Sequence, residues 1–188
     1  ALVSSPVWQN QNRSSAWAKG LEFNGTWNLD SIGLPQGTHA GVNLSYIKGK
    51  AKQTNEQETP INALSPWSAV YNLGYERWGI NAYLTHTAAK KPSDTVHSSD
   101  DLNNPWPFAK HSKAYTLFDL TGYVNLGKYF TLRAGAYNIG NKKYYTWESL
   151  RSIREFGTVN HVDNKTHAGI ERFTSPGRSY NFTLEAKF

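Results

Sequence analysis

Apolar and polar residues alternate with a period of two in seven separate segments of the chain. In the clearest segment, Leu21–Asp30, the residues Leu21, Phe23, Trp27 and Leu29 share one face with Gly25, and polar residues fill the other. The remaining segments lie at about 38–48, 64–75, 77–87, 118–126, 130–137 and 178–188. Alternation of this kind predicts strands with one apolar face. We therefore expect an all-β chain of about seven antiparallel strands.

The links between these segments alternate between short and long. The short ones are 31–37, the neighbourhood of Glu76, and 127–129; the long ones are 49–63, 88–112 and roughly 141–177. All eight prolines fall between strands or at a strand's first residues, where no ladder donor is lost. Short periplasmic turns and long extracellular loops are typical of a transmembrane β-barrel. A soluble sandwich has no reason to place every long loop at one end.

Aromatic residues gather near both ends of the predicted strands. Those near the short turns are Tyr75, Trp78, Tyr129, Phe130 and Phe188, and those near the long loops are Tyr46, Trp67, Tyr115 and Tyr180. Two girdles of amphipathic rings suit the two interfaces of a membrane. A strand of a soluble β-sandwich also has one apolar face, so that alternative stays open, but the girdles favour the barrel.

Composition changes this picture little. Hydrophobic residues make up 38% of the chain, and the mean hydropathy of −0.62 is that of a polar protein. Strands that alternate lipid-facing and lumen-facing residues average to such a value. The chain has no cysteine, which excludes disulfides and thiolate metal sites. It has no apolar run near the ~20 residues of a membrane helix and no signal peptide pattern.

The strand count implies that the chain is a fragment. Complete bacterial barrels have an even number of strands, whereas this chain begins in a polar, proline-containing stretch at 3–15 and then has seven. An unclosed sheet in lipid would leave unsatisfied backbone groups along both edges. We expect residues 1–188 to be a partial β-barrel domain whose missing strands lie before Ala1. The only helix expected is a short one at Trp147–Arg154.

Candidate chemistry is sparse, and we expect neither an enzyme nor a metal centre. The six histidines lack the spacing of a zinc site, although His97, His111, His161 and His167 fall in the predicted outer loops. Ser98 and Asp100 lie near His97, but no scaffold holds them as a catalytic triad.

Two loop clusters are candidates for binding a ligand. Trp106 and Phe108 lie in a proline-rich aromatic segment, which either anchors a partner protein or packs on the barrel rim. Arg151, Arg154 and Arg172, with Phe156, form a basic-aromatic group in the last loop. This group either meets an acidic ligand surface or pairs with the loop carboxylates Glu148, Glu155, Asp163 and Glu171.

Net charge adds only a general indication. The value of +6 suits acidic partners, such as lipopolysaccharide phosphates or haem propionates, or simply a solvated basic surface. No feature besides this charge points to nucleic acid, and we expect none as a partner.

Several motifs resemble the C-terminal part of TonB-dependent outer-membrane receptors. They are Ala136–Tyr144, Pro176–Tyr180, the final strand that ends in Phe188, and Lys19–Glu22 at the opening of a strand. The segments Tyr145–Gly157 and Gly169–Phe173 are more specific. They resemble the haemoglobin receptors within the haemoglobin, transferrin and lactoferrin receptor branch. Transferrin, lactoferrin and siderophore receptors are the alternatives within the family, and a passive porin is the alternative outside it.

The resemblance implies a 22-stranded barrel, closed by an N-terminal plug that is absent here and energised by the TonB complex through the missing N-terminal part. The seven strands would be its last, and Phe188 would belong to the signal read during outer-membrane assembly. Haem or iron would be the transported ligand, host haemoglobin the partner, and outer-membrane lipid the surroundings. No haem ligand is assigned to this fragment and no cofactor is expected to be bound by it. Polar residues expected to line the lumen or hold the plug are Glu22, Asp30, Asp119, Arg133, Glu185 and Lys187.

Overall fold

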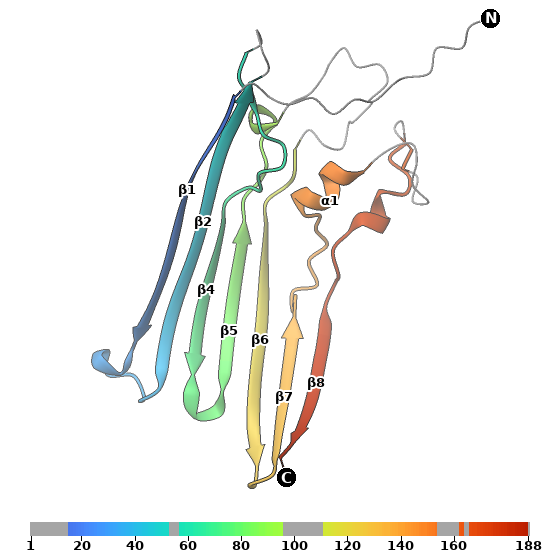
Figure 1. Ribbon diagram of the computed structural model, residues 1–188. Helices are drawn as coiled ribbons and strands as arrows, with labels where there is room; N and C mark the ends of the chain where they lie inside the picture. Colours follow the sequence, from blue (N-terminus) through green and yellow to red (C-terminus); the bar gives the residue numbers. More distant parts are fainter. Residues whose placement is uncertain (1–14, 53–56, 96–110, 154–161, 164–165, 188) are drawn as a thin grey trace, which may run out of the picture.

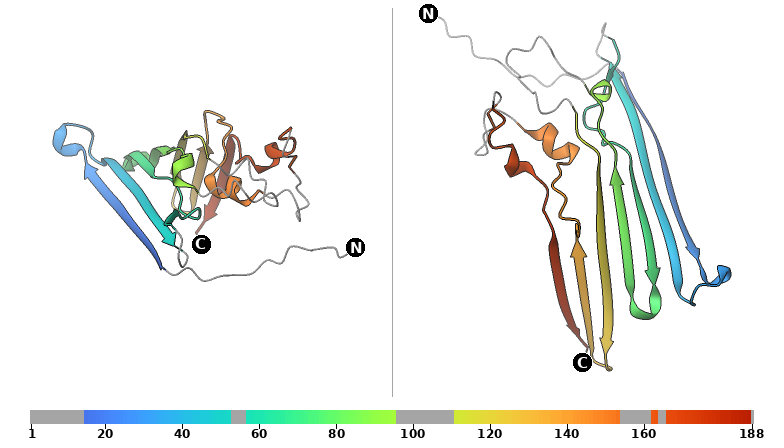
Figure 2. Two further views of the ribbon diagram at one scale, coloured as in Figure 1. Left: turned by 90° about the horizontal axis from the view of Figure 1, so that it is seen from above. Right: turned by 180° about the vertical axis from the view of Figure 1, so that it is seen from behind.

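The computed structural model describes residues 15–52, 57–95, 111–153, 162–163 and 166–187. These residues form one antiparallel sheet with the order β1-β2-β4-β5-β6-β7-β8, and a two-residue β3 pairs with β2 (Figure 1). The strands are β1 (Ser15–Asn28), β2 (Thr38–Lys52), β3 (Thr59–Pro60), β4 (Ser68–Tyr75), β5 (Ile80–Thr87), β6 (Tyr115–Leu126), β7 (Phe130–Tyr137) and β8 (Ser179–Ala186). The sheet is a single open layer (Figure 2). The prediction of seven substantial antiparallel strands is confirmed, and β3 was missed.

Strand boundaries differ from the predicted ones at the starts of the first and third strands and at the end of the last. The first strand begins at Ser15, not Leu21, because β1 pairs with β2 along its whole length, from Ser15↔Lys52 to Asn28↔His39. The third begins at Ser68 because the Leu64 amide donates to the Ile61 carbonyl in a turn. The last strand ends at Ala186, and Phe188 lies outside the described residues.

The short links all lie at one end of the sheet, the lower end in Figure 1. Two contain 3₁₀ turns, η1 (Asp30–Ile32) and η2 (Glu76–Trp78), and the third is the tight turn at 127–129. Gly79 follows η2 with φ of 57°, and Gly127 has φ of 70°, a backbone conformation that glycine adopts without strain. Asp30 therefore lies in a turn, and the prediction that the first strand extends to Asp30 was wrong, since β1 ends at Asn28.

Cross-strand register keeps every apolar set on the same side of the sheet. Phe23 pairs with Leu44 and Leu44 with Ala69. Further along the sheet, the apolar pairs include Leu73 with Ala82, Ala82 with Leu120 and Leu132 with Leu184. We call this side the apolar face. A one-residue slip at any ladder would break it, so the alternation in the sequence and the hydrogen-bond register agree along all seven strands.

Nothing in the described part of the chain covers the apolar face. Phe23, Trp27, Phe182 and Leu184 are 50%, 48%, 72% and 63% exposed. Ala69 is the only buried hydrophobic residue of the described strands; the others, Trp147, Leu150, Ile153 and Val162, lie in the long links. A sandwich would bury one face of each sheet in a shared core. The described residues therefore do not form a soluble sandwich, and the expected antiparallel sheet of the barrel type is confirmed.

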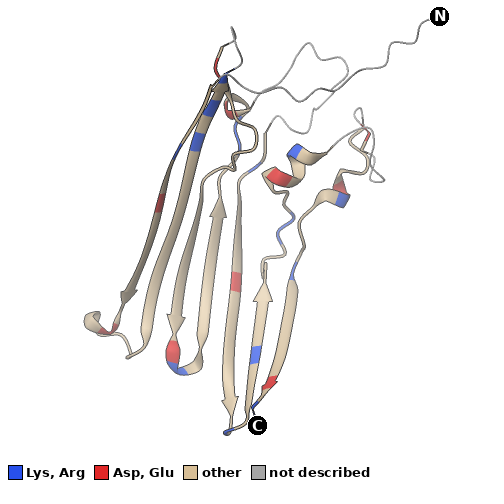
Figure 3. Ribbon diagram, in the orientation of Figure 1, with Lys and Arg blue, Asp and Glu red and all other residues tan. Residues whose placement is uncertain are grey.

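The opposite side, the polar face, carries amide, hydroxyl and charged side chains. Its cross-strand pairs include Asn24 with Asn43, whose side chains are hydrogen-bonded, and Thr131 with Glu185. Charged residues are few on the middle of the strands and more frequent at their ends and in the links (Figure 3). The described helices include none that is long and apolar enough to cross a membrane.

Candidate functional site

The long links converge at the other end of the sheet, the upper end in Figure 1, where they form one assembly. We call this assembly the cap and define it as residues 57–67, 88–95, 111–114, 138–153, 162–163 and 166–178. It contains η3 (Pro92–Asp94), the helix α1 (Trp147–Ser152) and the 3₁₀ helix η5 (Ile170–Phe173). The predicted helix at Trp147–Arg154 is thus confirmed as α1.

Trp147 joins the last link to the first. The Thr146 side chain caps α1 by accepting a hydrogen bond of 3.1 Å from the Ser149 amide, which fixes where the helix begins. Trp147 is only 2% exposed, and its Nε1 donates to the Asn62 carbonyl at 2.6 Å. A buried indole needs such an acceptor. This bond connects residues 85 positions apart and makes the two links one unit.

Lys90 brings the middle link into the same contact. Its side chain lies 5.6 Å from the centre of the Trp147 ring, and its Nζ donates to the Leu64 carbonyl at 2.7 Å. Lys90 is 6% exposed, and burial lowers its pKa, while the charges of Asp94 and Glu148 act in the opposite direction. An ammonium group held between an aromatic face and a carbonyl therefore fastens all three links together.

A small apolar core stabilises the outer part of the cap. Leu150, Ile153 and Val162 are buried, and Tyr145, Ile170 and Phe173 pack around them. The Ser149 hydroxyl donates to the Phe173 carbonyl at 3.2 Å, which ties α1 to the segment of η5. Burial raises the pKa of Tyr145, and the Glu171 carboxylate adds to the rise. The cap is therefore packed like a small soluble domain and not like a set of separate loops.

The candidate binding residues fall into two groups. Arg151 of α1 and Arg172 of η5 are both exposed, and neither lies within ion-pair distance of a carboxylate in the described part of the chain. Glu171 instead accepts a hydrogen bond from the Gly169 amide at 3.1 Å. The alternative in which these arginines pair with loop carboxylates is thus not seen in the described residues. Trp106, Phe108, Arg154 and Phe156 lie outside the described residues.

None of the described histidines belongs to a group of side chains that could hold a metal ion. His111 and His167 are exposed, whereas His97 and His161 lie outside the described residues. The described ranges contain no group of three or more His, Asp or Glu side chains arranged to hold a metal ion.

The polar face carries a hydrogen-bonded cluster that sequence reasoning missed. The Asn81 Oδ1 lies 3.2 Å from His39 Nε2 and also accepts from Asn72 Nδ2 at 3.2 Å. These side chains come from β5, β2 and β4. A Cβ on Gly74 would lie 2.3 Å from the His39 ring, so glycine is required for the cluster to form. Glycine inside a strand signals such close approach, and that signal was available in the sequence.

The polar residues that were expected to line the lumen or hold the plug have different surroundings in the structure. Arg133 lies 3.5 Å from Glu185, and Lys187 lies 3.8 Å from the same carboxylate, all on the polar face near the short-turn end. Asp119 accepts a hydrogen bond of 2.6 Å from the Asn138 amide and so holds the start of the last link. Asp119 therefore has a structural role at this point of the sheet. Glu22 is exposed on the polar face.

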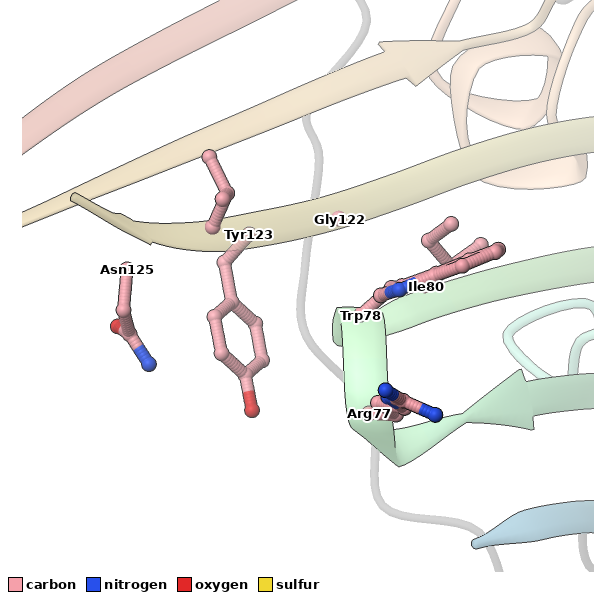
Figure 4. A pocket seen from close by; sticks show the side chains of 7 residues that line it. Arg77, Trp78, Ile80, Gly122, Tyr123 and Asn125 are labelled. Atoms are coloured by element: carbon pink, nitrogen blue, oxygen red, sulfur yellow. The ribbon is translucent and has the colours of Figure 1, made fainter.

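An open pocket of about 450 Å³ lies at the short-turn end (Figure 4). It exists because the β5–β6 ladder stops at Asn81↔Thr121, whereas β6 continues to Leu126. Its lining residues are Arg77, Trp78, Ile80, Gly122, Tyr123, Val124 and Asn125. They come from η2, β5 and β6 and include no carboxylate or histidine, so the pocket offers no catalytic constellation.

Comparison with known proteins gives one family. Residues 1–139 match the family described as TonB dependent receptor-like, beta-barrel. Hemoglobin-haptoglobin utilization protein B of Neisseria meningitidis serogroup C is 88% identical over 100% of this chain and 24% of the relative. Hemoglobin-binding protein A of Haemophilus influenzae is 42% identical over 99% of this chain and 19% of the relative.

A solved structure agrees on the fold. The copper transporter OprC superposes with a TM-score of 0.65 at 17% identity, over 92% of this chain and 24% of that structure's chain. At this identity the likeness concerns the fold alone. The chain spans about a quarter of the length of the first relatives it matches.

Proposed function

Because the chain belongs to the TonB-dependent receptor β-barrel family, whose members lie in the outer membrane, we propose that it is the C-terminal part of a receptor that acquires haem or iron from host haemoglobin. In this proposal residues 1–188 supply the last strands and the last three extracellular loops of a larger barrel. The apolar face meets lipid, the polar face lines the lumen, and the cap faces the host. The plug and the contact with the TonB complex belong to the remaining part of the receptor.

The observation that carries the proposal is the cap. Its three links share one set of contacts around Trp147 and Lys90, so they form a preorganised surface rather than three separate loops. A preorganised surface loses less conformational entropy on binding a large protein. The exposed Arg151 and Arg172 give this surface a positive charge that suits acidic regions of a carrier protein.

The transport path follows from the other side of the same sheet. The released ligand would pass along the polar face, where Glu22, Arg133, Glu185 and Lys187 contact the plug or line the path. The apolar face keeps this polar path separated from the hydrocarbon of the membrane. Haem or iron is the cargo in this proposal and not a resident group of the described residues.

Haemoglobin is the carrier that the relatives favour, since their names refer to hemoglobin-haptoglobin utilization, to hemoglobin binding, and to hemoglobin and hemoglobin-haptoglobin binding. Transferrin, lactoferrin and siderophore receptors of the same family are the alternatives that a binding experiment must separate. Outer-membrane lipid and lipopolysaccharide complete the proposed partners.

The test uses the full-length receptor in native outer-membrane vesicles. We expect it to bind haemoglobin and the haemoglobin–haptoglobin complex in surface plasmon resonance and to bind transferrin much more weakly. The double variant Arg151→Glu with Arg172→Glu should weaken haemoglobin binding roughly tenfold by removing the charge complementarity. Lys128→Glu, an exposed charge reversal in a turn at the opposite end of the sheet, serves as the matched control and should change nothing. Binding of transferrin alone would contradict the proposal.

Energy dependence is tested separately in cells. Haemoglobin as sole iron source should support growth only when the TonB complex and the proton gradient are intact. Uptake that rises in proportion to solute concentration without TonB would identify a passive porin instead.

A further inference from the structure

The apolar face is interrupted at the short-turn end of the sheet, where the β5–β6 ladder ends. The open pocket of about 450 Å³ lies there between η2 and β6, and we call it the groove (Figure 4). Its apolar lining residues are Trp78, Ile80, Gly122 and Val124. A Cβ built on Gly122 would meet its nearest atom, Ile80 Cγ1, at 3.6 Å, which is an ordinary contact. The space beside Gly122 is therefore open, and the groove has the size of a pocket for a small ligand or for part of a larger one.

Tyr123 bounds the groove toward the polar face. Its ring lies directly over Gly79 and leaves no space there for a Cβ, so it fills the gap between η2 and β6. The guanidinium of Arg133, the cross-strand partner of Tyr123, lies 5.3 Å from the centre of the same ring. The groove thus has an aromatic ring on the side of the lumen, and its apolar lining residues lie on the side that meets lipid.

Arg77 supplies a positive charge at the groove. It is the only lining residue with a charged side chain, and it is exposed. The neighbouring Glu76 lies beside Gly37, before the start of β2, with its Oε2 3.7 Å from the position of a Cβ on that glycine. Among the described residues, no carboxylate lies within ion-pair distance of Arg77. The groove therefore combines an apolar wall with one cation at its edge.

The aromatic residues and the backbone both place the groove at a membrane interface. Trp78 packs edge-on against Tyr75, with ring centres 5.4 Å apart, and such rings favour the boundary between hydrocarbon and headgroups. The β5–β6 ladder ends at Asn81↔Thr121, so the described strands pair with residues 122–126 only on the β7 side. Backbone groups without a strand partner are costly in hydrocarbon. They are tolerated at the level of the headgroups, where polar atoms can bond to them.

From these features we infer that the groove binds one anionic phospholipid of the inner leaflet of the outer membrane. Its phosphate would lie on Arg77, and an acyl chain would run along Trp78, Gly122 and Val124. The guanidinium group binds phosphate through paired N–H groups. The short turns of a membrane barrel lie on the periplasmic side, which the inner leaflet faces. The inference rests on the proposed function for the orientation of the sheet in the membrane, but not on the identity of the transported ligand.

The experiment uses full-length receptors that are delipidated in detergent. Each is titrated with phosphatidylglycerol and with diacylglycerol of the same acyl chains, and native mass spectrometry counts the lipid that stays bound. Arg77→Gln removes the charge, and Gly122→Val fills the space beside Ile80. Lys128→Gln, in the neighbouring exposed turn, is the control for the charge. Ala134→Val, at the cross-strand partner of Gly122 on the same face, is the control for the added side chain.

We expect the parent receptor and both controls to hold one phosphatidylglycerol most tightly, and Arg77→Gln to bind it roughly tenfold more weakly. Gly122→Val should lose this tight binding. Diacylglycerol, which has no phosphate, should bind to the parent about as weakly as phosphatidylglycerol binds to Arg77→Gln.

Three results would overturn the inference. Two of them are phosphatidylglycerol binding by Arg77→Gln equal to that of the parent, and binding by Gly122→Val equal to that of the parent. The third is the absence of tight binding by the parent, which would mean that another segment of the receptor fills the groove. Haemoglobin binding, measured in parallel, should be the same in all these proteins and tests the proposed function separately.

Discussion

The sheet and the cap use the same residue types in opposite ways. Trp27 on the apolar face is 48% exposed, whereas Trp147 in the cap is 2% exposed and hydrogen-bonded. The difference shows that the two regions are built for different surroundings. The sheet satisfies its backbone in ladders and leaves its apolar side chains outside for lipid. The cap buries its apolar side chains within itself, as a protein region in water does.

Different kinds of substitution should therefore destabilise the sheet and the cap. The cap depends on packing and on a few side-chain hydrogen bonds, so truncating a buried residue should damage it. Among the described residues, no core covers the apolar face of the sheet, so truncation there should matter less than the introduction of a charge.

The largest expected effect comes from Trp147→Ala. Removing this buried indole leaves a cavity and removes the hydrogen bond from Trp147 Nε1 to the Asn62 carbonyl, and should lower the local stability of the cap by about 3–5 kcal/mol. Hydrogen exchange of the full-length receptor in lipid nanodiscs should show lost protection in the cap and unchanged protection in β4–β7. Trp27→Ala, on the apolar face, should leave the cap protected. Equal loss in both variants would argue against a separate cap core.

The next effect concerns Leu84→Arg. Leu84 lies on the apolar face between Tyr71 and Phe118, so an arginine there would face hydrocarbon at a cost of about 2–4 kcal/mol. The folded fraction of the full-length receptor in vesicles, followed by gel mobility across a urea series, measures this cost. Thr85→Arg, one residue along on the polar face, is the matched control and should be tolerated much better. Similar costs for the two variants would contradict the assignment of the faces.

A smaller effect is expected for Lys90→Met. Methionine has a side chain of similar length, but it cannot donate the hydrogen bond that Lys90 Nζ gives to the Leu64 carbonyl. The loss should lower the stability of the cap by about 1–3 kcal/mol. Hydrogen exchange of residues 57–67 provides the measurement. Lys91→Met, at an exposed neighbouring position, should have no effect.

The lowered pKa of Lys90 gives this prediction a pH signature. A lysine whose pKa is lower in the folded cap than in the unfolded chain penalises folding while it is protonated. This penalty is fully present below the folded-state pKa and is relieved as pH rises from that value toward 10.5. The parent cap should therefore gain stability over that window relative to Lys90→Met, and a parallel pH dependence of the two proteins would contradict the assignment.

The smallest effect is expected for the Arg133 and Glu185 pair. The side chains are 56% and 40% exposed, so their interaction is screened by water and should contribute only about 0–1 kcal/mol. A double-mutant cycle with Arg133→Gln and Glu185→Gln measures the coupling. A coupling far above this range would indicate that the plug shields the pair in the full-length receptor.

The sequence allowed the faces of the sheet to be predicted, because a period of two is a local property of each strand. Residues such as Phe182 and Leu184 reveal their side from their own neighbours. Strand ends were less predictable, because the start of β1 at Ser15 depends on its partner Lys52, which is far along the chain.

The contacts of the candidate site could not be predicted from local sequence patterns. Trp147 meets Asn62, Lys90 meets Leu64, and His39 meets Asn81 across 85, 26 and 42 positions of the chain. No periodic pattern links these residues. Arg151 and Arg172 were proposed as candidates from the sequence because both belong to a segment rich in arginine and aromatic residues. Only the structure shows that, among the described residues, no carboxylate lies within ion-pair distance of either arginine.

The most direct test of the account is whether the apolar face meets lipid. The chain contains no cysteine, so single cysteines at Phe182, Thr183, Leu184 and Glu185 of the full-length receptor report on known positions of β8 when labelled with a nitroxide. In membranes, we predict that collision with oxygen is high at 182 and 184 and low at 183 and 185, with the opposite order for a water-soluble nickel reagent. Equal accessibility at all four positions, or the reverse alternation, would contradict it.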